Sequence, residues 1–123
     1  MHKKNVLLIY PTIIGEIPNS IAQISSVFES EGFNVHTSIN SFNKPLTNKD
    51  FLDLATEVEA EIIGISTLTF EINNTYELIK SFKDRGLTVI VGGPHATTEP
   101  EEVINNGADI VVRNEGEETI KEL

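Results

Sequence analysis

The sequence contains no cysteine, so the chain can form no disulfide, no thiolate zinc site and no cysteine-ligated iron–sulfur cluster. Any chemistry that depends on such a cluster must reside outside this chain. Basic residues are also scarce, with 9 Lys and Arg against 19 Asp and Glu and a net charge of −10. Because such an acidic surface repels phosphate backbones and anionic lipid headgroups, we expect neither nucleic acid nor a membrane as a partner.

Long hydrophobic runs are missing as well. The first apolar run, residues 6–10, is shorter than a signal-peptide core or a membrane span. This favours a cytoplasmic protein. A chain of 123 residues has room for one domain and not for two.

The usual phosphate and metal motifs are absent too. Neither G-x-G-x-x-G nor G-x-x-x-x-G-K-[ST] occurs, and residues 10–15 lack the serine and glycine density of a flavin phosphate loop. The histidines, at positions 2, 36 and 95, have no i, i+4 partner. A receiver domain would need an acidic pair after the first strand, where Tyr10 and Pro11 stand. An independent enzyme is therefore disfavoured, because no nucleophile with a base, metal cluster or phosphate loop is found.

What the sequence does contain is a repeating pattern of buried strands and amphipathic helices. Apolar residues recur at helical spacing within 17–28, 51–58 and 72–82, and a short last helix is expected from Glu117. Strand 33–39 alternates and reads as an edge strand. The other strands are apolar on both faces, as in parallel sheets covered by helices, and comprise residues 6–9, 62–65, 87–91 and 110–112.

These elements predict an α/β, flavodoxin-like (Rossmann-like) three-layer sandwich. Right-handed crossovers with an edge strand second favour a five-stranded parallel sheet in the order 2-1-3-4-5. Gly32, Gly86 and Gly107 each precede a strand and are expected to close helices in the left-handed conformation. Thr47 with Asp50, and Thr98 ahead of Pro100, are expected to cap helix starts.

Ligands of open α/β sheets bind beyond the carboxyl ends of the strands, so the loops after the third and fourth strands are informative. The third strand is followed by Ser66-x-Leu68 and the fourth by Gly92-Gly93, with 23 residues between the two motifs. In motif order and spacing the chain resembles cobalamin-binding domains. Side-chain-free backbone at Gly64, Gly92 and Gly93 would let a long nucleotide tail pass, and Ser66 could donate a hydrogen bond to its base.

A longer motif makes the resemblance to one group of cobalamin-binding domains more specific. The string Gly92-Gly93-Pro94-His95-Ala96-Thr97, followed later by Asn114-Glu115-Gly116-Glu117, is similar to the N-terminal cobalamin-binding domain of cobalamin-dependent radical SAM methyltransferases and cyclases. Asn114 replaces a glycine of that pattern but tolerates a left-handed conformation. Thr12 stands where other branches of the family carry the cobalt-ligating histidine of Asp-x-His-x-x-Gly, a stretch that ends here at Gly15.

The resemblance implies a cofactor module. It implies base-off cobalamin with no histidine ligand to cobalt, and we expect no side chain of this chain to ligate a metal. Residues 1–123 would be the N-terminal part of a longer enzyme, whose missing C-terminal barrel would add a 4Fe–4S cluster and S-adenosylmethionine. We expect no catalysis from this chain alone. The implied cofactor contacts are Pro11, Thr12, Gly15, Gly64, Ser66, Thr67, Leu68, Gly92, Gly93, Pro94, His95, Asn114, Glu115 and Gly116.

Plainer interpretations stay open. The glycines can belong to an ordinary turn, His95 can be a solvated loop residue, and Glu115 can serve a helix dipole. The alternative function is a cofactor-free flavodoxin-like scaffold or protein-interaction domain.

Overall fold

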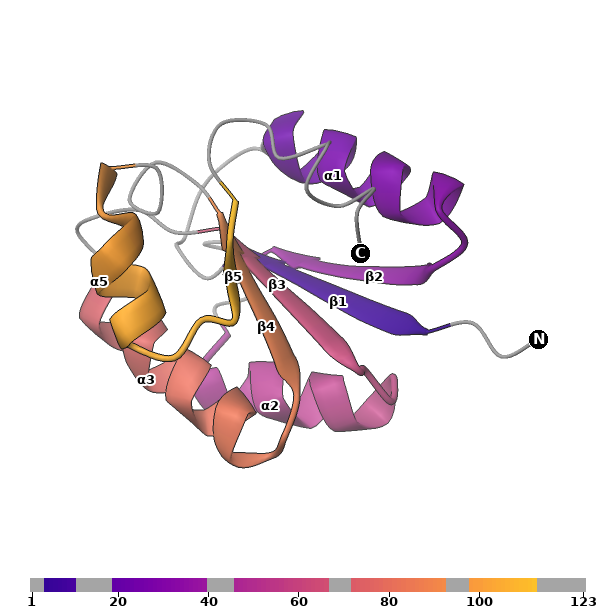
Figure 1. Ribbon diagram of the computed structural model, residues 1–123. Coiled ribbons are helices and arrows are strands. Elements are labelled where there is room, and N and C mark those ends of the chain that lie inside the picture. Colours follow the sequence, from indigo (N-terminus) through magenta and orange to yellow (C-terminus); the bar gives the residue numbers. More distant parts are fainter. Residues whose placement is uncertain (1–3, 11–18, 40–45, 67–71, 93–97, 113–123) are drawn as a thin grey trace.

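Strands and helices alternate in the computed structural model, which describes residues 4–10, 19–39, 46–66, 72–92 and 98–112. Five strands form one sheet in the order β2-β1-β3-β4-β5, and every neighbouring pair is parallel (Figure 1). The strands are β1 (Asn5–Tyr10), β2 (Asn34–Ile39), β3 (Ile62–Ser66), β4 (Thr88–Gly92) and β5 (Ile110–Val111). The helices are α1 (Asn19–Ser30), α2 (Asn48–Glu57), α3 (Ile72–Asp84) and α5 (Pro100–Asn105).

This topology confirms the flavodoxin-like fold and the strand order predicted from the sequence. The alternating strand, β2, lies at one edge of the sheet beside β1. Because it has a neighbour on one side only, its side chains need not be apolar on both faces. The helix expected from Glu117 lies outside the described residues.

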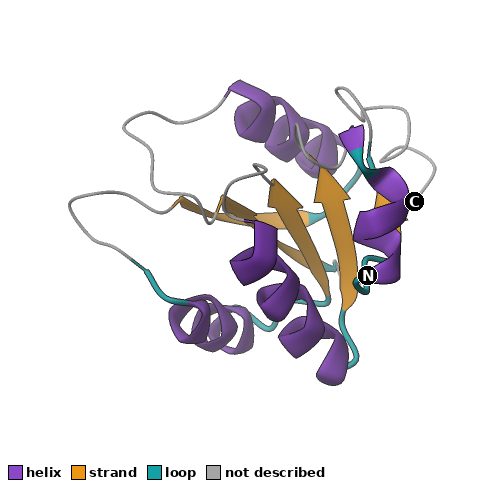
Figure 2. Ribbon diagram, turned by 90° about the vertical axis from the view of Figure 1, so that its left-hand side faces the viewer, coloured by secondary structure: helices purple, strands orange, loops and turns teal. Residues whose placement is uncertain are grey.

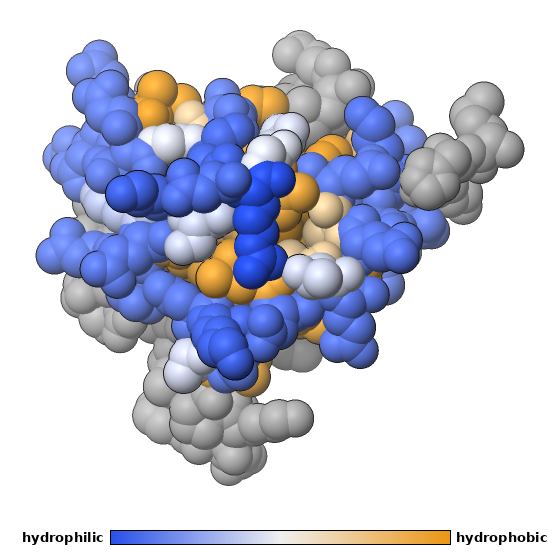
Figure 3. All heavy atoms as spheres, turned by 90° about the horizontal axis from the view of Figure 1, so that it is seen from below, coloured by the Kyte–Doolittle hydropathy of each residue, from blue (hydrophilic) through white to orange (hydrophobic). Residues whose placement is uncertain are grey.

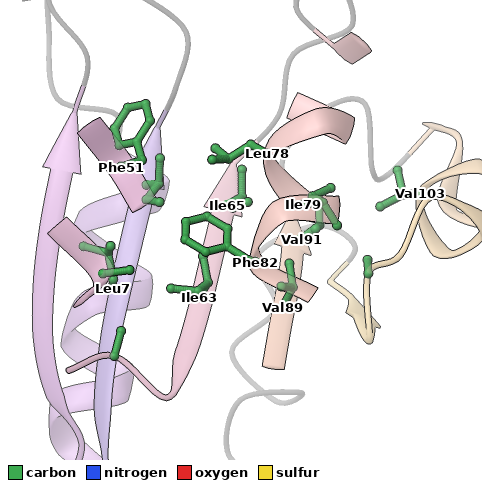
Figure 4. Close-up of a cluster of buried hydrophobic side chains, with 14 residues drawn as sticks. Leu7, Phe51, Ile63, Ile65, Leu78, Ile79, Phe82, Val89, Val91 and Val103 are labelled. Atoms are coloured by element: carbon green, nitrogen blue, oxygen red, sulfur yellow. The ribbon is translucent and has the colours of Figure 1, made fainter. Parts of the chain in front are cut away.

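Helices cover the sheet on both sides, as Figure 2 shows. One face carries α2, α3 and α5, whose apolar side chains join those of the strands in a large buried cluster (Figure 4). The other face carries α1, which contributes Phe28 to a smaller cluster. Since successive strand residues point to opposite faces, Leu7 and Ile9 belong to the first cluster and Val6 and Leu8 to the second.

Each described helix is followed by a residue in the left-handed conformation. Gly32, Gly86 and Gly107 have φ values of 91°, 79° and 113°, which confirms the expected left-handed positions. After α2 the same position is held by Glu59, with φ 55°. Its N–H donates to Thr56 O at 3.2 Å and the N–H of Ala60 donates to Ala55 O at 2.9 Å, the paired bonds of a Schellman motif. The strained glutamate was not predicted.

One of the two expected helix caps is confirmed. Thr47 caps α2, and its side chain and that of Asp50 form a reciprocal capping box. The prediction that Thr98 caps α5 was wrong. The N-cap residue is Glu99, and the side chain of Glu99 makes no capping hydrogen bond. Pro100 occupies the first helical position, where the N–H that proline lacks would have no partner within the helix in any case.

The outer surface over α2 and α3 is mainly hydrophilic. Figure 3 looks at the molecule from below the view of Figure 1 and shows hydrophobic atoms confined to the spaces between polar side chains. No helix within the described ranges is long and apolar enough to cross a membrane.

Candidate functional site

The ends of β3 and β4 bring two predicted site residues together. Ser66 and Gly92, which are separated in sequence by α3 and most of β4, are Cα partners in adjacent parallel strands. Each is the last residue of its strand. They therefore lie side by side at the carboxyl edge of the sheet, where ligands of open α/β folds bind.

Both residues belong to the face that α1 covers. Because side chains alternate along a strand, Ser66 lies on the face of Ile62, and Gly92 on the face of Ile90. Ile62 and Ile90 are members of the smaller cluster together with Phe28 of α1. The candidate site is thus on the α1 side of the sheet, opposite α2 and α3.

Gly92 is not required by the packing that the structure describes. A Cβ added there would lie 3.6 Å from the carbonyl oxygen of Val112 and 3.8 Å from its Cβ, which are ordinary van der Waals distances. Its φ is outside the left-handed region, so the backbone conformation does not demand glycine either. Neither its φ nor the described packing therefore accounts for a glycine here, and a glycine at a strand end often marks a close approach of another group to the backbone.

Gly64 has a packing contact that the sequence did not predict. A Cβ added at Gly64 would lie 2.6 Å from Cδ2 of Leu8, its partner on β1. The space over this glycine is therefore already filled by a buried leucine, which is 2% exposed. A ligand contact at Gly64 stays a prediction, and a side chain at this position would have to displace the end of the Leu8 side chain, which packs across β3.

Ser66 supplies the polar group of the described site. It is partly buried, and no hydrogen bond is found between its hydroxyl and another residue of the described ranges. A serine hydroxyl can donate one hydrogen bond and accept others. Since a buried polar group gains stability from a partner, Ser66 is suited to bind a polar atom of a ligand that approaches Gly92.

A partly exposed ion pair links the end of α3 to the start of β5. Nζ of Lys83 lies 2.8 Å from Oδ2 of Asp109, and the same carboxylate oxygen accepts a hydrogen bond from the Val89 N–H at 2.8 Å. Burial raises the pKa of Asp109, but the hydrogen bonds from Lys83 and Val89 and the charge of Lys83 outweigh it and hold the pKa below its ordinary value. This contact fixes the start of β5, which carries Val112 to the side of Gly92.

The other predicted site residues lie outside the described residues, so their positions stay predictions. They are Pro11, Thr12, Gly15, Thr67, Leu68, Gly93, Pro94, His95, Asn114, Glu115 and Gly116. Within the described ranges, no group of three or more His, Asp or Glu residues is arranged to hold a metal ion. A surface hollow against α5 is lined by Pro100, Glu101, Ile104 and Asn105 and contains none of the predicted residues.

Two residues of the site were missed by sequence reasoning. Leu8 looks like any other residue of an apolar strand, and only the register between β1 and β3 places it over Gly64. Val112 was assigned to a strand without a role, although it is the residue that borders Gly92. A glycine flanked by isoleucines in a buried strand is a signal for close approach of a neighbour, and it could have prompted the search for Leu8.

Known sequences match this chain at the level of a family and of individual proteins. Residues 16–123 match the family described as the B12 binding domain. Dimethylamine corrinoid protein 2 of Methanosarcina mazei is 32% identical over 125 residues, covering 97% of this chain and 56% of that protein. An uncharacterized methyltransferase of Synechocystis sp. is 44% identical over 61 residues, which are 50% of this chain and 11% of that protein. The chain thus spans about half of the corrinoid protein and a small part of the methyltransferase.

Solved structures share the fold over almost the whole chain. A cobalamin-binding protein from Desulfitobacterium hafniense has a TM-score of 0.71 and 26% identity, and the match covers 98% of this chain and 56% of that one. The radical S-adenosylmethionine methyltransferase TsrM from Kitasatospora setae, solved with cobalamin and a 4Fe–4S cluster bound, has a TM-score of 0.83 at 19% identity, covering 98% of this chain and 26% of that one. The second likeness is one of fold alone.

Proposed function

Because this chain belongs to the B12-binding domain family, we propose that it binds cobalamin over the carboxyl ends of β3 and β4, on the α1 side, as the cofactor module of a methyl-transfer enzyme. The observation that carries this proposal is the pairing of Ser66 with Gly92. A hydroxyl without a described partner stands there beside a glycine that neither φ nor packing with described residues requires. A ligand that approaches the backbone closely and presents a polar atom accounts for both.

The proposed contacts extend from this pair into the loops that follow it. Ser66 and Gly92 hold the buried part of the cofactor, and the resemblance in sequence adds Thr67, Leu68 and the run from Gly93 to His95. Gly64 acts indirectly, through Leu8. When bound, cobalamin would supply a cobalt centre able to carry a methyl group. The role of this chain is to bind the cofactor and shield its tail from water.

We further propose that the cofactor is bound base-off, without a histidine ligand to cobalt. The support is in the sequence, where Thr12 occupies the position of the ligating histidine of other branches. The proposal is tested by the electron paramagnetic resonance spectrum of bound cob(II)alamin, because a nitrogen ligand to cobalt, from the base or from a histidine, splits the resonance lines. A histidine-ligated electron paramagnetic resonance signal would contradict it.

The parent enzyme is proposed to be a cobalamin-dependent radical SAM enzyme, with residues 1–123 as its N-terminal domain. The motif from Gly92 to Thr97 supports this, and the match to a small part of an uncharacterized methyltransferase supports a parent that is longer than this chain. On this proposal the 4Fe–4S cluster and S-adenosylmethionine belong to the following barrel. The isolated domain then binds cobalamin but produces no methylated product.

The alternative, a cofactor-free scaffold, is favoured by one observation. Gly64 has a packing reason of its own, since Leu8 fills the space over it, and so its presence does not call for a ligand. Gly92 has no such reason among the described residues. The two functions are separated by mixing the purified chain with hydroxocobalamin and following the absorbance of the cofactor through gel filtration. Co-elution at one cofactor per chain supports binding, whereas complete separation supports the scaffold.

A further inference from the structure

The turn that ends α5, residues 103–108, requires a glycine at position 107. The φ of Gly107 is 113°, which a residue with a side chain rarely adopts. Its N–H donates to Ile104 O at 3.0 Å, and the N–H of Ala108 donates to Val103 O at 3.3 Å, the paired bonds of a Schellman motif. A Cβ added at Gly107 would also lie only 3.3 Å from Cγ2 of Ile79. Backbone conformation and packing therefore both demand glycine here.

Asn106, the residue before this glycine, closes the same turn with its side chain. It is the C-cap residue of α5, and its Nδ2 donates to Glu102 O at 2.8 Å. The same carbonyl oxygen accepts the backbone N–H of Asn106 at 3.1 Å, so both of its lone pairs are used. The side chain of Asn106 belongs to an exposed residue, which water can reach.

An asparagine followed by glycine can react with its own backbone, and asparagine is among the thermolabile residues of proteins. The Gly107 nitrogen, which no side chain of its own residue shields, gives its proton to a solvent base and forms a bond to Cγ of Asn106. The bond from Cγ to Nδ2 breaks, and Nδ2 takes a proton from water and leaves as ammonia. A second water then opens the five-membered imide ring at either carbonyl. The product is aspartate or isoaspartate, and no oxidant or reductant is needed.

The folded geometry opposes this reaction in three ways. Asn106 has ψ 10°, so the Gly107 nitrogen nearly eclipses the Asn106 nitrogen, whereas ring closure requires it to turn toward Cβ of Asn106. The N–H of Gly107 is bound to Ile104 O. The leaving nitrogen, Nδ2, is bound to Glu102 O. The turn must therefore open before the two reacting atoms can meet.

We propose that Asn106 is a deamidation site and that the closed α5 turn limits its reaction to the moments when the turn opens. The contacts of Asp109 oppose opening, because its carboxylate binds Nζ of Lys83 and the N–H of Val89, each at 2.8 Å. They tie the chain just after the turn to α3 and β4. Local opening of such a segment requires less free energy than global unfolding. The inference is independent of cobalamin binding.

The test follows the amide-to-acid mass change at Asn106 by mass spectrometry of digested samples, after incubation of the purified chain at mildly alkaline pH. One sample is folded and one is unfolded in guanidinium chloride. Because the rate tracks the population of the open form when opening is fast, unfolding is expected to raise the rate at least about tenfold. Asn105 is the internal control, since the side chain of Asn106 shields the nitrogen that would attack it.

Two lysine variants test the contact that opposes opening. Lys83→Met removes the bond to Asp109 but keeps the apolar stem near Gly107, and it is expected to raise the rate in the folded chain about fivefold. Lys49→Met is the matched control, because its contact with Asp53 is 3.9 Å long and highly exposed. It should leave the rate unchanged.

Other outcomes overturn the inference. No acid at position 106 in either sample overturns the site, and equal rates in the folded and unfolded chain overturn protection by the turn. Equal rates in the two lysine variants overturn the part of Asp109. If Lys83→Met does not fold, hydrogen exchange of the Gly107 N–H in the wild-type chain gives the open fraction. The folded rate should equal the unfolded rate multiplied by that fraction, and a faster folded rate overturns the inference.

Discussion

The Cδ2 methyl of Leu8 lies where a side chain at Gly64 would begin, 2.6 Å from the ideal Cβ position. The contact joins β1 to β3 inside a cluster in which Leu8 is 2% exposed. A side chain at position 64 must therefore displace a packed leucine, and packed cores resist such displacement.

Alanine at position 64 is expected to destabilise the fold by about 1 to 3 kcal/mol through overpacking. Gly92→Ala is the matched control, because it lies on the same face and its added Cβ would meet Val112 only at ordinary distance. It is expected to change the free energy of unfolding by less than about 0.5 kcal/mol or to raise it, since alanine restricts the unfolded chain. Urea unfolding measures both, and equal effects of the two substitutions would contradict the packing described here.

The contact between Leu8 and Gly64 also predicts coupling. In Leu8→Val the methyl group over Gly64 is gone, so Gly64→Ala should cost less in that background than in the wild-type chain. A double-mutant cycle is expected to give a coupling energy of about 0.5 to 3 kcal/mol, the range for residues in direct contact. Additive free energies would show that the strain at position 64 comes from another neighbour.

Asp109 is expected to stabilise the fold through its ties to Lys83 and Val89. The pair is about one-third exposed, so solvent screens it, and most of the loss in Asp109→Ala comes from leaving the Val89 N–H without its acceptor. We expect a loss of about 1 to 2 kcal/mol. Asp53→Ala is the control, because its contact with Lys49 is 3.9 Å long and highly exposed, and a change below about 0.5 kcal/mol is expected there.

The same contact has a pH dependence. The folded pKa of Asp109 lies below the ordinary value of 3.8, so its contribution is fully present above that value and is lost as the pH falls through the lower folded pKa. The difference in unfolding free energy between the wild-type chain and Asp109→Asn should therefore shrink in acid. A difference that grows as the pH falls below 3.8 would contradict the assigned direction of the pKa shift.

Replacing Glu59 with glycine is expected to stabilise the fold. Its φ of 55° is a conformation that costs a non-glycine residue about 1 kcal/mol, whereas glycine adopts it freely. Glu59→Gly should raise the free energy of unfolding by about 0.5 to 1 kcal/mol. Glu57→Gly, two residues earlier within α2, should instead lower it by up to about 1 kcal/mol. Thermal unfolding distinguishes them, and destabilisation by Glu59→Gly would show that the glutamate side chain contributes more than its backbone strain.

The fold was largely predictable because its signals are local. The apolar runs that became β1, β3 and β4 are buried on both faces, and Gly32, Gly86 and Gly107 mark helix ends that only a left-handed residue can make. The left-handed conformation of Glu59 was not predicted, because glutamate does not favour it and no glycine marks the end of α2. Local sequence preferences do not reveal the positions at which tertiary structure imposes a conformation against them.

The site was predictable only in part, because its contacts are set by register. The motif spacing placed Ser66 and Gly92 at adjacent strand ends, and the β3–β4 pairing agrees. The packing of Leu8 over Gly64 was not predicted because the two residues lie 56 positions apart along the chain, and their contact depends on the exact β1–β3 pairing. The ion pair of Lys83 with Asp109 likewise spans 26 positions, and no sequence pattern connects the two.

The most direct test of cobalamin binding beside Gly92 compares two valines on β4. Gly92→Val places a branched side chain at the carboxyl edge, next to Ser66, while Thr88→Val places the same side chain on the same face at the amino end of the strand. Both variants are titrated with hydroxocobalamin after unfolding curves establish that they are folded. We predict that Gly92→Val lowers the affinity at least about tenfold, a loss of about 1.4 kcal/mol or more, and that Thr88→Val binds as the wild-type chain does. Equal affinity in all three proteins would contradict the account.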